Sequence, residues 1–250
     1  MTGTKGDLCV TTITILGSIA SVVGIVIALM TDNMKATIAL ISVIVALVVL
    51  IIYFIYILNT FIQKEYPEEY LKLSYFLTFE VLDETHSRLD GYRLIQSKRP
   101  ILKQIHWGFK WTGSQQPVIS SALQECNGKI SRNGSSYDTV VLNLKRPLKF
   151  NETAVLHFHA EMDDIEKIAQ PHLDVKIDAP ISVVNYNVVL CNKDRNFNSN
   201  AKFMRMPISS DAPAAYETLA TIAFNRTTRS YQHVLTNPEV GYYYRLEWEK

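Results

Sequence analysis

Two histidines and a glutamate, His157, His159 and Glu161, are the residues of this sequence best spaced for chemistry. Residues two apart lie on one face of a β-strand, so these three side chains could point toward a single metal ion. A metal site needs a third or fourth strong ligand, and the next histidine, His172, would have to be brought there by the fold. We therefore favour outward-facing histidines on a solvated strand, and we predict no metal and no cofactor.

The other reactive residues match no catalytic pattern. The sequence contains no glycine-rich phosphate loop and no HExxH or GxSxG motif. Its three cysteines, at positions 9, 126 and 191, are too few and too widely spaced for a disulfide scaffold or a cysteine-rich zinc module. We predict that the protein is not an enzyme and has no catalytic residue.

Basic residues gather in one stretch of a nearly neutral chain. The net charge of +1, from 25 basic and 24 acidic residues, excludes a dedicated binder of DNA or RNA duplexes. Residues 88–110 contain six basic residues and one acid, Asp90, with aromatic residues interleaved. Such a segment could bind the phosphates of a small ligand and stack a base, or it could face solvent or anionic lipid. The candidate ligand-binding residues are Arg93, Lys98, Arg99, Lys103 and Lys110.

The elements that would position these residues are β-strands. Apolar and polar residues alternate in several segments, as a strand with one buried and one solvated face requires. The clearest segments are 73–81, 105–111, 140–144, 154–162, 173–177 and 242–248. With weaker segments and turn signals, they predict about ten short strands, which is typical of an antiparallel sandwich or a barrel. We expect this all-β soluble domain to cover residues 74–250.

Two uncharged runs precede the β-rich part. Val10–Met30 has 21 residues and Ile38–Ile62 has 25, and about 20 apolar residues cross a bilayer as a helix. The polar segment 31–35 between them is typical of a turn. Residues 1–62 are therefore predicted to form a two-helix transmembrane hairpin, followed by a charged connector at 63–73. The alternative for the first run is a cleaved signal peptide.

The flanking charges favour one orientation of the hairpin. Two spans place both chain ends on the same side of the membrane. Lys5, Lys64 and Lys72 flank the hairpin, whereas Lys35 alone lies in its turn. Because positive residues are enriched on the cytoplasmic side, we expect both termini in the cytoplasm and a multi-pass protein of the bacterial inner membrane.

Small residues recur along one side of the first run, at Gly17, Ser21, Gly24 and Ala28. Small residues at this spacing let membrane helices approach closely. The face could join subunits of a homo-oligomer, or it could pack only against the second span. The sequence leaves both possibilities open.

An apolar hairpin, a short charged connector and a β-rich domain together resemble the two-transmembrane, β-rich membrane effectors of bacterial antiphage signalling, of the CBASS and type III CRISPR kinds. The resemblance is one of architecture and includes no sequence motif. Residues 88–113 and 241–249 also look like a β-sandwich module of bacterial signalling and defence proteins.

The resemblance implies a membrane effector for antiviral defence. Its β-domain would sense a signal such as a cyclic oligonucleotide, and its oligomerised hairpins would disrupt the inner membrane. The implied partners are membrane lipid, further copies of the chain and the cyclic oligonucleotide. The alternative is a membrane-tethered protein-interaction module whose spans are inert, and a third possibility is a receptor domain on the outer side.

Overall fold

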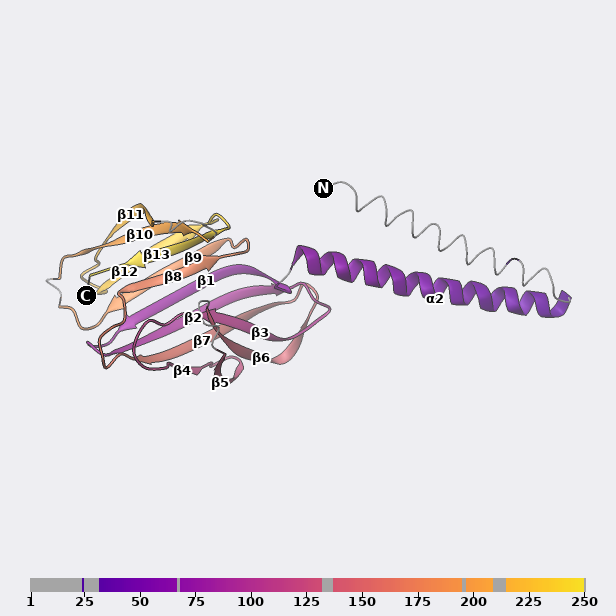
Figure 1. The fold of residues 1–250 in the computed structure, drawn as a ribbon, viewed down its shortest axis with the longest axis horizontal. Coiled ribbons are helices and arrows are strands. Elements are labelled where there is room, and N and C mark those ends of the chain that lie inside the picture. The colour runs from indigo at the N-terminus through magenta and orange to yellow at the C-terminus, as the bar shows by residue number, and fades with distance from the viewer. Residues whose placement is uncertain are drawn as a thin grey trace. The chain divides into compact units, whose positions relative to one another are not determined.

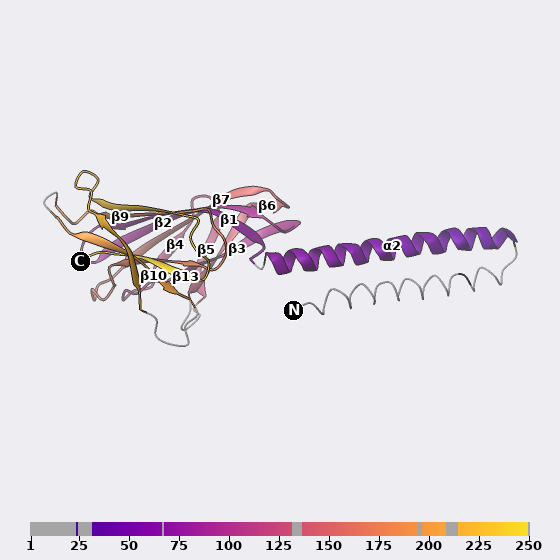
Figure 2. The same ribbon diagram turned by 90° about the horizontal axis from the view of Figure 1, so that it is seen from above.

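The computed structural model divides into two compact units, with the boundary between Glu65 and Tyr66. Figures 1 and 2 show a long helix in the first unit and a β-rich second unit. The residues that the structure describes are 24, 32–66, 68–131, 137–194, 197–208 and 215–249.

The first unit contains helix α2, which runs from Asp32 to Glu65. Its segment Met34–Glu65 has 32 residues; the most apolar window of this segment has a mean hydropathy of 3.3, and none of that window is buried in the structure. At 1.5 Å per residue this segment is about 48 Å long, more than the ~30 Å hydrocarbon core of a bilayer. By length and composition, α2 is therefore a candidate membrane-spanning helix.

The predicted two-helix hairpin is wrong for the part of the chain that the structure describes. That part has one helix able to span a membrane, and the predicted turn at 31–35 contributes its first residues, from Asp32 onward. The sequence predicts a turn at 31–35 because this polar segment between the two apolar runs is so short. A segment without glycine or proline does not break a helix, and an acidic residue at a helix N-terminus is favourable there. Apart from Gly24, the first predicted span lies outside the described residues.

The second unit is built from strands in three sheets. A six-stranded sheet has the order β12-β9-β1-β2-β7-β4, a four-stranded sheet β11-β10-β13-β8, and a three-stranded sheet β3-β6-β5. The strands are β1 Tyr70–Val81, β2 His86–Ser97, β3 Ile101–Phe109, β4 Val118–Ser120, β5 Glu125–Ser131, β6 Asp138–Lys149, β7 Thr153–Asp163, β8 His172–Ile177, β9 Val183–Leu190, β10 Asn200–Pro207, β11 Glu217–Ala223, β12 Ser230–Thr236 and β13 Tyr242–Glu247. The unit is therefore β-rich, as the alternation predicted, and its sheets pack as a sandwich.

The sheets are not purely antiparallel, which corrects the predicted fold class. Strand β1 pairs in parallel with β9, from Ser74 opposite Val183 to Val81 opposite Leu190. Its other neighbour, β2, is antiparallel, so β1 lies inside a mixed sheet (Figure 1). The alternation of apolar residues identifies a strand and its buried face, but it carries no information about the direction of the neighbouring strand.

The core lies between the six-stranded sheet and the two smaller sheets. Trp107 of β3 stacks on Phe158 of β7, with 5.3 Å between ring centres. Tyr186 of β9 meets Phe203 of β10 edge-on at 5.4 Å. All four rings are almost completely buried. Aromatic pairs of this kind add to the stability that their buried area provides, so one large sheet holds both smaller sheets against it.

Candidate functional site

A cavity of about 430 Å³ opens where the two smaller sheets fail to join. Strand β3 is the edge of the three-stranded sheet and β8 is the edge of the four-stranded sheet, and no ladder of the described strands connects them. The cavity is lined by residues of these two edges and by inward-facing residues of β1 and β2. We call this feature the β3/β8 cleft. Its size is within the range of small-molecule sites, about 300–1,000 Å³.

One buried cation lines the cleft. Arg93 of β2 is only 8% exposed, and its guanidinium carbon lies 4.6 Å from the ring centre of Tyr75 and 4.1 Å from that of Trp107. Its Nε has no hydrogen-bond partner, and no ion pair of the described residues includes Arg93. Stacking on aromatic rings compensates in part for the lost hydration of a guanidinium. Tyr70 and Tyr75 also interact with the group through their hydroxyls, whereas the Nε donor has no partner.

The tyrosines beside Arg93 do not neutralise it. Burial raises the pKa of Tyr70 to about 12, even though the nearby guanidinium acts in the opposite direction. Burial likewise raises the pKa of Tyr75 above its usual value. Both phenols are therefore uncharged near neutral pH, and Arg93 keeps a full positive charge in a mostly apolar surrounding.

The carboxylates of the cleft are already paired with other cations. Their partners are Lys72 for Glu68 (2.7 Å), Arg99 for Glu69 (2.6 Å), Arg245 for Asp174 (2.7 Å) and Lys72 again for Asp178 (2.7 Å). Lys176 lies 3.6 Å from Asp178 as well. Because Lys72 serves two of these carboxylates, Glu68 also acts electrostatically on Arg93, although Arg93 forms no direct ion pair among the described residues.

The structure separates the five basic residues that the sequence singles out. Arg93 and Lys110 line the cleft, and Lys98, Arg99 and Lys103 do not. Lys98 is buried and donates to Gln96 Oε1 and Asn151 Oδ1, each at 2.7 Å. Lys103 and Lys110 are exposed on β3 and just after it. The five cations therefore do not converge on one surface, and a ligand-binding role for each of them stays a prediction.

Sequence reasoning missed the position of Arg93 although a signal was present. In β2, Leu89, Gly91, Arg93 and Ile95 share one face because they alternate along the strand. The other members of this series are apolar or glycine, so the face is the buried one. A lone arginine at an apolar position of the alternation marks a buried cation rather than a surface patch.

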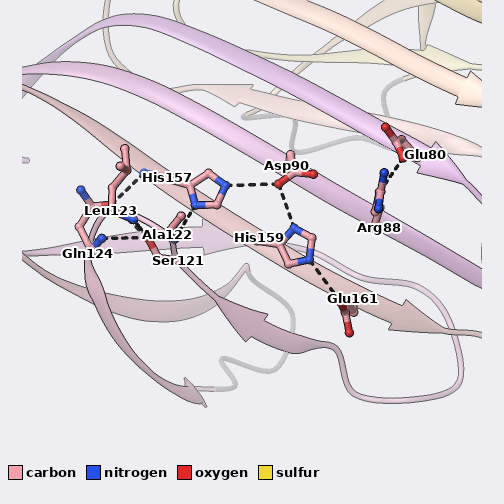
Figure 3. Close-up of polar contacts among 10 residues, drawn as sticks. All are labelled: Glu80, Arg88, Asp90, Ser121, Ala122, Leu123, Gln124, His157, His159 and Glu161. Carbon is pink, nitrogen blue, oxygen red and sulfur yellow. Dashed lines mark hydrogen bonds and ion pairs between the residues drawn. The ribbon is translucent and has the colours of Figure 1, made fainter.

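The histidines form a second polar cluster, on the outer face of the six-stranded sheet (Figure 3). His157 Nδ1 accepts a hydrogen bond from the backbone N–H of Ala122 at 2.9 Å, and His157 Nε2 lies 3.2 Å from Asp90 Oδ1. His159 Nδ1 contacts the same Asp90 oxygen at 2.9 Å. Because Nδ1 of His157 is an acceptor, the neutral ring carries its proton on Nε2 and donates it to Asp90.

His157 is not the solvated residue that the alternation predicted. It is 5% exposed, because residues 121–124 cover this part of the outer face. Gln124 completes the cover by accepting the backbone N–H of His157 at 2.8 Å. Burial alone would raise the pKa of the Asp90 carboxyl. Hydrogen bonds from the two histidines outweigh that effect, so the pKa of Asp90 is lowered. Each of these polar groups has a partner inside the cluster.

The described residues contain no group of three or more histidines, cysteines and acids arranged to hold a metal ion. His172, the third candidate ligand, lies on β8 beside the cleft, away from the cluster. Burial lowers the pKa of His172. The histidine cluster is therefore best described as a network of protein hydrogen bonds.

The predicted helix-packing face falls almost entirely outside the described residues. Gly17, Ser21 and Ala28 lie there, and Gly24 alone is described. A Cβ atom added at Gly24 would meet no other atom within 4 Å. The role of these four residues in assembly stays a prediction.

Comparison with known proteins assigns no family. No protein family matches the sequence, and no curated protein sequence matches it either. Among solved structures, the chain is similar to an M1 zinc metallopeptidase from Deinococcus radiodurans with a TM-score of 0.33, 13% identity, and coverage of 68% of this chain and 42% of that one. For baculovirus P35 the TM-score is 0.40 and the identity 10%, with coverage of 74% of this chain and 99% of that one. For yeast LTA4 hydrolase the TM-score is 0.38 and the identity 8%, with coverage of 72% of this chain and 29% of that one. The chain spans less than half the length of the metallopeptidase, and these likenesses are too distant to indicate a function.

Proposed function

We propose that this protein is a membrane-anchored sensor whose β-rich unit binds a small anionic ligand in the β3/β8 cleft. The observation that carries the proposal is Arg93, a buried guanidinium that lines the cleft and forms no direct ion pair among the described residues. Helix α2 is the candidate anchor. Among the described residues that line the cleft, no constellation of catalytic residues accompanies Arg93, and we propose binding as the role of this site.

A buried charge without a partner is costly, and proteins keep one where something supplies the partner. An anion in the cleft would supply the direct ionic partner that Arg93 lacks. Functional sites are where such strained electrostatics concentrate. The same reasoning excludes the outer histidine cluster, since its groups already satisfy one another.

The cleft also bears on the proposed role in antiphage signalling. A cyclic oligonucleotide carries at least two phosphates, whereas the cleft offers Arg93 and, in addition, the exposed Lys110. Of these two cations only Arg93 is buried, and we therefore propose a ligand whose anionic group binds there. An antiphage role with a cyclic oligonucleotide as the signal remains a competing proposal, and the binding experiment includes it.

The experiment uses the full chain in nanodiscs and anilinonaphthalene sulfonate as a fluorescent anionic probe, with empty nanodiscs as the blank. Arg93→Met should weaken binding roughly 10- to 150-fold, because a hydrogen bond to a charged group is worth about 1.5–3 kcal/mol. Ala179→Trp, which fills the cleft from its rim, should also block the probe. The matched control Lys103→Met removes a cation of β3 that does not line the cleft and should leave binding unchanged.

If neither Arg93→Met nor Ala179→Trp changed binding of the probe, the proposal would be overturned. Calorimetry with cyclic di-, tri- and tetranucleotides forms the second arm. Binding of one of them that depends on both Arg93 and Lys110 would establish the oligonucleotide alternative in place of a ligand held by Arg93 alone.

A further inference from the structure

We infer that one end of the β-rich unit docks on the headgroups of the membrane that α2 spans, and that it prefers anionic lipid. The docking surface consists of the turn between β2 and β3 (residues 98–100), the turn between β6 and β7 (residues 150–152) and the exposed residues of β3 and β6 beside them. We call this surface the basic end. The inference rests on the anchor in the proposed function and not on the ligand cleft.

The basic end is close to the anchor along the chain. The apolar run of α2 ends at Ile62, and Glu65, the last residue of the helix, is about 5 Å of helical rise beyond it. Four further residues, which can extend by at most about 14 Å, lead to Glu69. The backbone oxygen of Glu69 accepts the N–H of Lys98 at 2.8 Å, and its carboxylate pairs with Arg99 at 2.6 Å. The length of the chain therefore keeps this turn within reach of the headgroups.

Hydrogen bonds join the two turns into one surface. The N–H of Ser97 donates to the backbone oxygen of Glu152 at 2.8 Å, and the N–H of Asn151 donates to that of Ser97 at 2.9 Å. Lys98 is buried, donates to Asn151 Oδ1 at 2.7 Å and places its Nζ 5.6 Å from the ring centre of Phe150. These contacts hold the turn that carries Phe150, so the fold itself sets the exposure of this ring.

Two large apolar side chains are exposed on the basic end. Ile101 is 62% exposed and Phe150 is 46% exposed. Ile101 lies opposite Lys149 in the ladder of β3 and β6, and the next pair, Leu102 and Leu148, is buried. Because successive side chains of a strand point to opposite faces, Ile101 and Lys149 point outward together. Exposed apolar side chains beside cations are suited to insertion among lipid headgroups.

The charge of this surface is positive. Its exposed cations are Lys103, Lys145, Arg146 and Lys149. Arg146 pairs with Glu152 at 3.3 Å, whereas the three lysines form no ion pair with any described residue. Four cations and this one acid leave a net charge of +3. The adjacent strand β5 adds one exposed acid and one exposed base, Glu125 and Lys129, and does not change the sum. The surface therefore complements an anionic lipid layer.

The test uses the full chain in nanodiscs of phosphatidylcholine brominated on its acyl chains near the headgroups, with or without phosphatidylglycerol. Bromine quenches tryptophan on contact, and Phe150→Trp places a reporter in the second turn. The unsubstituted protein supplies the background of the three native tryptophans. We expect additional quenching of the reporter when phosphatidylglycerol is present.

A second reporter controls for contact along the rest of the unit. Leu82 is 41% exposed and directly follows β1, whose 12 residues span about 36 Å. Leu82→Trp therefore places a tryptophan at the end of β1 opposite to the basic end. This reporter should be quenched in neither kind of nanodisc.

The charge dependence is tested on the Phe150→Trp protein. Lys103→Gln combined with Lys149→Gln should lower the ratio of docked to undocked units roughly 30-fold, because each cation near an anionic surface contributes roughly 5-fold. Salt at about 1 M, which shortens the Debye length to about 3 Å, should also release the unit. The matched control, Lys193→Gln combined with Arg226→Gln, removes the same charge from the loops after β9 and before β12 and should leave quenching unchanged.

Equal quenching of the two reporters would overturn the inference, and so would quenching at position 150 that does not depend on phosphatidylglycerol, on the two lysines or on salt. A chain that does not remain with the nanodiscs in gel filtration would overturn the anchor and the inference together. A chain that remains with them while the reporter at position 150 is unquenched would overturn the inference alone, and the anchor and the ligand cleft would stand.

Discussion

The two polar clusters of the β-rich unit differ in how completely they are satisfied. On the outer face, His157, Asp90 and His159 exchange hydrogen bonds with one another and with residues 121–124. In the interior, Arg93 has aromatic neighbours and an Nε without a partner. Buried polar groups are normally hydrogen-bonded, so an exception needs an explanation.

The comparison teaches that spacing in the sequence is a weaker guide to a ligand site than unmet hydrogen-bonding capacity. The histidine pair has the more suggestive spacing, yet its ring nitrogens are occupied by hydrogen bonds with Asp90 and, for His157, with the backbone of Ala122. The lone arginine has no motif around it, yet it is buried beside a cavity and its Nε donor has no partner. Four measurements of stability can break or sharpen this contrast, and all can use tryptophan fluorescence, because Trp107, Trp111 and Trp248 all lie in the β-rich unit.

The largest effect is expected for His157→Ala. The change leaves a cavity and removes the partners of the Ala122 N–H and of Asp90. We expect the free energy of unfolding to fall by about 2–4 kcal/mol, measured by urea unfolding of the full chain in nanodiscs. The control His159→Ala, at a more exposed position, should cost clearly less. Equal losses would show that burial of His157 is not what holds the cluster.

Gly91→Ala should be the next most destabilising change. A Cβ atom at Gly91 would lie 2.9 Å from Cζ2 of Trp107, which is fully buried and cannot move away freely. Overpacking of this kind costs about 1–3 kcal/mol. The control Gly108→Ala meets its nearest atom, in Tyr137, at 3.6 Å and should be tolerated better. A neutral Gly91→Ala would mean that the ring next to Arg93 is loosely held.

The outer cluster should lose stability in acid through Asp90. Its pKa is lowered in the folded protein, so its contribution is present above the unfolded carboxyl value of about 3.9 and is lost as pH falls through the folded value. Asp90→Asn should therefore cost about 1 kcal/mol at pH 7 and progressively less toward pH 3. Urea midpoints across that range give the difference. If the stability difference between Asp90→Asn and the unchanged protein grew as the pH fell, the lowered pKa of Asp90 would be contradicted.

The smallest effect is expected for Arg93→Met without ligand, within about 1 kcal/mol of the unchanged protein. The substitution removes a buried charge that forms no direct ion pair among the described residues, and the gain from losing its desolvation offsets the loss of its contacts with Tyr75 and Trp107. The control Arg245→Met leaves Asp174 without its two hydrogen bonds, at 2.7 and 2.9 Å, and should destabilise more. If Arg93→Met is as harmful as Arg245→Met, Arg93 is a structural residue and the contrast between the clusters fails.

Strand positions and much of the core could be predicted from the sequence. The alternation in residues 73–81 and 105–111 correctly placed Tyr75, Leu77 and Trp107 in the interior. It could not supply the parallel pairing of β1 with β9, because that pairing depends on residues more than 100 positions away. The cleft depends on the same arrangement of sheets, so it could not be predicted from the sequence either.

The burial of His157 shows a second limit. Alternation distinguishes the two faces of one sheet, but it does not reveal which outer positions another segment will cover. The cover comes from residues 121–124, which precede β7 by some 30 positions and contain no apolar pattern pointing to that contact. The helix was misjudged for a related reason, since charged residues at 31–35 were compatible with a turn and with a helix start.

The parallel pairing of β1 also delays the completion of its sheet during synthesis. Strand β1 can pair with β2 as soon as both leave the ribosome, but β9 begins at Val183, about 100 residues after β1 ends at Val81. At 5–20 residues per second, that edge of β1 waits roughly 5–20 s for its partner. An unpaired strand edge recruits other chains, so slow translation lengthens the interval in which nascent chains on neighbouring ribosomes can join through β1.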